Sequence, residues 1–75
     1  MRGISTIVEK LVHDYLMAQE NNITDSNLYE VVIKEVEKPL FVQTLHAVQG
    51  NKAKAARILG INRNTLHKKL SDMGL

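Results

Sequence analysis

The feature that most constrains this chain is the spacing of three glycines in its last third, Gly50, Gly60 and Gly74. Glycine commonly follows the last residue of a helix, because it adopts a positive φ at no steric cost. Polar and apolar residues between the glycines alternate with helical rather than strand periodicity. The pattern therefore predicts two short helices, over residues 52–59 and 63–73, joined by a tight turn.

Residue types inside these two segments fit a helix-turn-helix unit. Asn51 and Asn62 precede the segments and are good N-cap residues. Ala56 is small enough for close helix packing, Gly60 follows four residues later at the turn, and Leu66 would fill the angle between the helices. We expect the other members of this small core to be Leu59, Ile61, Leu70 and Met73.

Polar side chains of the second segment are predicted to lie opposite its leucines. Arg63 can donate two hydrogen bonds to guanine, and Asn64 can pair with adenine. This outward face comprises Arg63, Asn64, His67, Lys68 and Ser71. Lysines and hydroxyls beside it suit phosphate contacts, which fix register rather than sequence; these are Lys52, Lys54, Thr65 and Lys69. The alternative is that the glycines are ordinary helix ends and the basic residues are solvated surface.

Charge is divided unevenly along the chain. Residues 1–49 carry four basic and seven acidic side chains, whereas residues 50–75 carry six basic and one acidic. The two parts thus have formal charges of −3 and +5. A basic segment of this kind favours a polyanion as its ligand. The rival hypothesis is a helical protein-interaction or dimerisation module without a DNA role, which would not need the basic segment.

Two longer amphipathic helices are predicted before Gly50, over residues 5–19 and 28–49. Thr6 and Glu9 have the spacing of a capping box at the start of the first. The polar residues 20–26 predict a loop. Pro39 falls inside the second helix, and since its flanks lack turn residues, we expect one long helix with a bend.

The apolar surface of these two helices exceeds what a chain of 75 residues can bury by itself. The chain has no cysteine, so disulfides cannot supply the missing stability. We therefore predict an all-α homodimer. The interface residues predicted from the pattern are Ile7, Leu11, Tyr15, Val32, Val36, Leu40 and Leu45.

Other classes of function lack support in the sequence. His13, His46 and His67 fall on three different predicted helices, and no nucleophile motif, phosphate loop or metal-ligand spacing is present. We predict no enzyme activity, no cofactor and no metal. No signal peptide or membrane-length apolar run is present, so a cytoplasmic location is expected.

Residues 27–75 resemble the Fis family of bacterial DNA-binding proteins and, equally, the C-terminal DNA-binding domains of NtrC-type response regulators. The likeness rests on Leu28-Tyr29-Glu30, on Glu35 through Leu40, on Gly50-Asn51 and on the run from Ala55 through Leu70. It implies one Fis-type domain over residues 1–75, with dimerisation helices in 1–49 and the helix-turn-helix in 50–75. It also implies a bacterial, nucleoid-associated homodimer that bends double-stranded DNA in transcription regulation.

By matching position, the resemblance assigns DNA contacts to Asn62, Arg63, Thr65 and Lys68, and a DNA-backbone contact to Asn51. His67 departs from the family, which usually has arginine there. Nothing here corresponds to the N-terminal β-hairpin arm of the nucleoid protein. Two alternatives stay open: a free-standing protein, or the DNA-binding domain of a two-component regulator that also carries receiver and ATPase domains.

Overall fold

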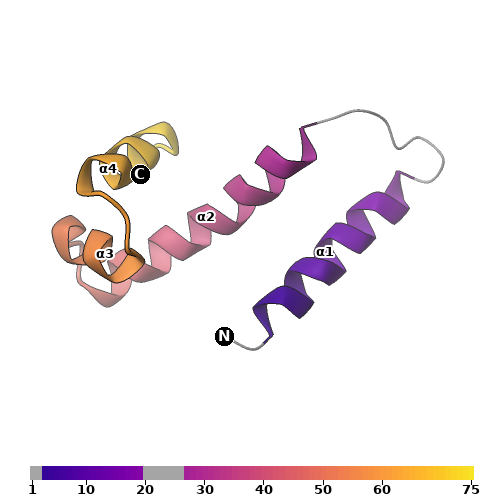
Figure 1. Cartoon of the computed structure of the whole chain (residues 1–75), viewed down its shortest axis with the longest axis horizontal. Coiled ribbons are helices and arrows are strands. Elements are labelled where there is room, and N and C mark those ends of the chain that lie inside the picture. Colours follow the sequence, from indigo (N-terminus) through magenta and orange to yellow (C-terminus); the bar gives the residue numbers. More distant parts are fainter. Residues whose placement is uncertain (1–2, 20–26) are drawn as a thin grey trace. The chain divides into compact units, whose positions relative to one another are not determined.

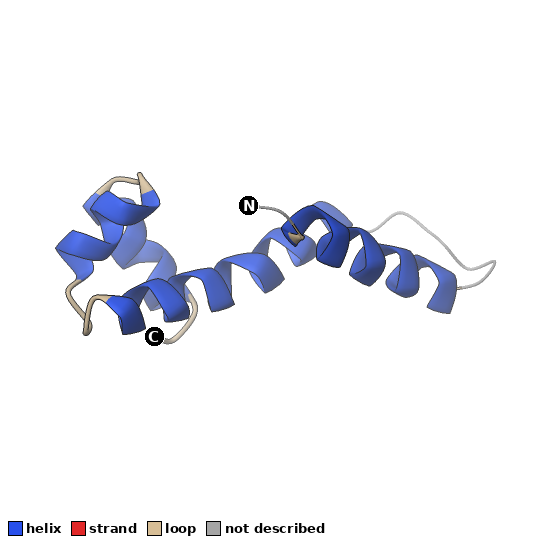
Figure 2. Cartoon of the chain, turned by 90° about the horizontal axis from the view of Figure 1, so that it is seen from below, coloured by secondary structure: helices blue, strands red, loops and turns tan. Residues whose placement is uncertain are grey.

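A computed structural model describes residues 3–19 and 27–75 and confirms the all-α prediction. Four helices follow one another in these residues, α1 (Ile4–Ala18), α2 (Leu28–Ala47), α3 (Lys52–Leu59) and α4 (Arg63–Asp72) (Figure 1). Figure 2 shows helices and connecting turns and no strand in the described part. The loop predicted over residues 20–26 lies outside it. None of these helices is both long enough and apolar enough to cross a bilayer.

The chain divides into two units, Met1–Val32 and Ile33–Leu75. In the first unit, α1 begins at Ile4, and Gly3 is its N-cap residue with a φ of 95°. The carbonyl of Gly3 accepts from the amide of Ile7 at 2.9 Å. The predicted capping box at Thr6 is therefore wrong, because Thr6 already lies within the first turn.

One turn further along α1, the Lys10 ammonium donates to the Asp14 carboxylate at 2.9 Å. This hydrogen bond, followed by the contact with His13, lowers the pKa of Asp14 from its ordinary value. Both side chains are exposed on the helix surface, where such i,i+4 interactions contribute little. No residue of α1 is buried, so its apolar side chains stay open to a further contact.

Helix α2 runs without interruption through Pro39, which confirms one long helix, whereas the bend at Pro39 stays a prediction. Proline removes one backbone donor, and its ring crowds the preceding turn. Residues two apart in a helix point about 200° from one another, so Pro39 lies away from the buried Phe41. One turn later the hydroxyl of Thr44 donates to the carbonyl of Leu40 at 2.7 Å.

The turn after α2 uses two consecutive residues with positive φ. Gln49, rather than a glycine, takes the first left-handed position with a φ of 55°, and Gly50 follows at 82°. The amide of Gly50 donates to the carbonyl of Leu45 at 2.8 Å, which closes the helix end. At the next turn Gly60 has a φ of 72°, as predicted, and the Ile61 amide donates to the Ala56 carbonyl.

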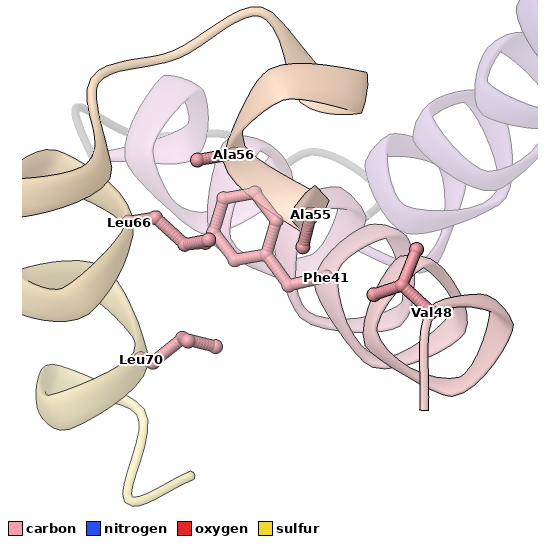
Figure 3. Close-up of a cluster of buried hydrophobic side chains, with 6 residues drawn as sticks. All are labelled: Phe41, Val48, Ala55, Ala56, Leu66 and Leu70. Carbon is pink, nitrogen blue, oxygen red and sulfur yellow. The ribbon is translucent and has the colours of Figure 1, made fainter. Parts of the chain in front are cut away.

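The core of the second unit is shared by three helices. Phe41 of α2 points toward Ala56 of α3 and Leu66 of α4 (Figure 3). Ala55 and Leu66 are both 0% exposed. The complete buried set is Phe41, Val48, Ala55, Ala56, Leu66 and Leu70. The predicted core positions Leu59, Ile61 and Met73 are partly buried against it. The helix-turn-helix is thus closed by the C-terminal half of α2, which the sequence pattern did not indicate.

Candidate nucleic-acid interface

Asparagine side chains cap the N-termini of both helices of the helix-turn-helix, as predicted. The Oδ1 atom of Asn51 accepts from the amide of Lys54 at 3.1 Å. The Oδ1 atom of Asn62 accepts from the amide of Asn64 at 2.7 Å. Capping uses only the carbonyl oxygen of each asparagine side chain, so the side-chain NH2 group keeps both of its N–H donors free. Because both asparagines are exposed, these donors can reach a phosphate or a base edge.

Helix α4 presents a sharply divided surface. Leu66 and Leu70, one turn apart, are buried against α2 and α3. The polar residues predicted to contact DNA mostly lie on the exposed part of the helix or at its N-cap. The exposed set is Asn62, Arg63, Asn64, Thr65 and Lys68. On and before α3, Asn51, Lys52 and Lys54 are exposed as well.

Helices α3 and α4 both begin with charges that the helix dipole disfavours. Neither has an acidic residue in its first turn. Basic side chains take that place, Lys52 and Lys54 in α3 and Arg63 in α4. The positive end of a helix dipole favours acidic residues there and attracts anions. These basic residues lower the stability of the free helix ends and raise the attraction for a polyanion.

Two predicted contact residues differ from this exposed pattern. His67 is half-buried, and its Nε2 atom is enclosed without a hydrogen-bond partner among the described atoms. It follows Leu66 and precedes Leu70 by three positions, so its ring lies at the border of the core. Lys69 is also half-buried, and its Nζ atom lies 3.0 Å from Oε2 of Glu37 in α2.

The side chains predicted for a dimer interface fall into two groups. Ile7 and Leu11 of α1 are 60% and 62% exposed, which is high for apolar side chains. Tyr15, Val36 and Leu40 are exposed too, and Val32 is half-buried. Leu45 differs, because it packs against the core of the helix-turn-helix. Exposed apolar residues absent from the prediction include Ile4, Tyr29, Val31 and Ile33.

The contact of Glu37 in α2 with Lys69 in α4 could not be predicted from the sequence. Glu37 is 32 positions away from Lys69, and local patterns report pairs only three or four positions apart in a helix. Phe41 and Val48 fit the apolar pattern of a helix, but that pattern does not show that they belong to this core. Their contacts depend on how α2 packs against α3 and α4.

Comparison with known proteins identifies a family and several similar proteins. Residues 32–73 match the family described as "Bacterial regulatory protein, Fis family". The chain is 44% identical over 73 residues to the DNA-binding transcriptional regulator NtrC of Azospirillum brasilense, covering 97% of this chain and 15% of that protein. It is 38% identical over 74 residues to the DNA-binding protein Fis of Buchnera aphidicola, covering 99% and 75%. It is 43% identical over 68 residues to the DNA-binding protein Fis of Yersinia enterocolitica, covering 91% of this chain and 68% of that protein.

Proposed function

The chain belongs to the Fis family of bacterial regulatory proteins, and from this premise we propose that it acts in transcription by binding double-stranded DNA. Its α4 is the recognition helix in the major groove, and α3 lies across the backbone. One observation supports this proposal most. Helix α4 buries two leucines and exposes Arg63, Asn64 and Lys68, and the start of α3 beside it is rich in basic residues.

The roles of the side chains follow from their chemistry. Arg63 reads guanine, and Asn62 and Asn64 donate to base edges or nearby phosphates. The side chains at the start of α3 bind the DNA backbone. The proposed contact set is Asn51, Lys52, Lys54, Asn62, Arg63, Asn64, Thr65, His67 and Lys68; Lys69, already paired with Glu37, acts differently.

The proposal includes a homodimer that bends its DNA. The exposed apolar side chains of α1 and α2 supply the contact surface between two copies. Only residues 48–51 separate the end of α2 at Ala47 from the start of α3 at Lys52, so each recognition helix is tied closely to the dimer. Rigidly held helices whose spacing differs from the ~34 Å groove repeat require the DNA to deform.

Its relatives suggest two settings for the domain. The chain spans 15% of the NtrC relatives' length, so receiver and ATPase domains would be its neighbours in a regulator of that kind. It spans about two thirds or more of the Fis proteins, which fits a free-standing regulator. In either setting we expect a cytoplasmic, nucleoid-associated protein whose own domain binds rather than catalyses.

Equilibrium binding to duplex DNA across a range of salt concentrations tests this function. Counterion release predicts a slope of about −0.9 in log affinity against log salt for each phosphate neutralised. Several contacts in each protomer therefore give a steep slope. If affinity is weak and unaffected by salt, the chain is the rival interaction module.

A further inference from the structure

Lys69 and Glu37 form an ion pair between two helices, and it is the only such interhelical pair in residues 3–19 and 27–75. Nζ of Lys69 lies 3.0 Å from Oε2 of Glu37, and the two side chains are 40% and 21% exposed. The other charged contacts in these residues lie within α1. Partial burial sets this pair apart from a surface pair, because water screens it less.

The pair lies at the edge of the core between α2 and α4. Glu37 precedes Phe41 by one helical turn, and Lys69 directly precedes Leu70. Both partners line a cleft whose walls also include Lys34, Lys38, Asp72 and Met73. The Lys69 side chain is therefore directed toward α2. Phe41 and Leu70 are both buried in the core that joins the two helices, and the ion pair connects the same helices at the edge of that core.

Its neighbour Lys68 has a different environment. Lys68 is exposed, has no ion-pair partner among the described side chains, and lies about 100° around the helix from Lys69. The two adjacent lysines of α4 thus differ: Lys68 is exposed, whereas the charge of Lys69 is already neutralised by Glu37.

We infer that Lys69 and Glu37 are positioning residues, which hold the recognition helix at its angle on α2 and do not neutralise a DNA phosphate. This inference rests on the proposed DNA-binding function. Arg63 lies six residues before Lys69, about 9 Å along the helix axis. Loss of the pair lets α4 rotate at its C-terminal end and displaces Arg63 relative to the bases. Preference for the specific site then falls, while the number of phosphates neutralised stays the same.

Salt-dependent binding of matched variants tests the inference. We expect Lys69→Met and Glu37→Gln to lower preference for the specific site several-fold and to leave the salt slope unchanged. Lys68→Met, the matched control, should reduce the slope by about 0.9 for each phosphate that the protein no longer neutralises. If Lys69→Met reduces the slope as Lys68→Met does, Lys69 contacts a phosphate and the inference is wrong.

Exchange of the two charges gives a second, independent readout. The double variant Glu37→Lys with Lys69→Glu should regain most of the site preference that each single reversal removes. Glutamate cannot take over a phosphate contact that lysine makes. A folded double variant that does not regain site preference would therefore also overturn the inference. Absence of salt-dependent binding by the wild-type chain would instead refute the DNA-binding function itself.

Discussion

At the scale of single residues, we propose that Arg63 decides how the chain distinguishes one DNA sequence from another. It lies exposed in the first turn of α4, where no acidic side chain neutralises it. We expect Arg63→Ala to lower discrimination at one base pair by about 1–3 kcal/mol, because a bidentate guanine contact is removed. Competition binding with duplexes that differ at single positions measures this effect.

Lys54→Ala is the matched control for this prediction. Lys54 is exposed on α3 and suits a phosphate contact, so its removal should weaken all sequences alike and reduce the salt slope. Should Arg63→Ala also weaken all sequences equally, Arg63 is a phosphate contact and another residue reads the bases.

At the scale of helices, the start of α3 depends on one side chain. Asn51 satisfies the amide of Lys54, and its replacement by alanine should cost about 1 kcal/mol of unfolding free energy. For a domain of this size that lowers the melting temperature by roughly 4–8 °C. Thermal unfolding without DNA measures the effect. Asn64→Ala, which removes an exposed asparagine without a capping role, should leave the midpoint nearly unchanged.

Helices can be predicted from this sequence because their signals are local. Asn51, Asn62 and Gly60 act on residues within one turn, so the predicted α3 covers the residues that form it and the predicted α4 is correct to within one residue. The predicted start of α1 is late, because Gly3 caps the helix without a side chain. The roles of Phe41 and Glu37 could not be predicted, since both depend on contacts between helices far apart in the sequence.

At the scale of the whole molecule, we expect two copies to associate through the exposed apolar residues of α1 and α2. Val36→Glu should prevent dimerisation, because it places a charge in the contact surface. Analytical ultracentrifugation at micromolar concentration measures the assembly. Ile58→Glu is the control: Ile58 is an apolar side chain that is 61% exposed, but it lies on α3, outside the predicted contact surface. A wild-type chain that sediments as a folded monomer would contradict the dimer.

The dimer is also expected to bend its site. Smooth bending of 20–30 base pairs by 40–90° costs on the order of 1–6 kcal/mol, which contacts to flanking phosphates offset. Electrophoretic mobility should therefore vary with the position of the site in fragments of equal length. Mobility that is independent of position would show that the DNA stays straight.

Selection from a pool of randomised duplexes by the purified chain tests the central claim most directly. The claim is that α4 reads base edges and that two copies bind together. Selected sequences should then converge on two half-sites related by two-fold symmetry, with a conserved guanine in each half-site that disappears with Arg63→Ala. A bound pool that stays random, or an identical motif selected by Arg63→Ala, would contradict it.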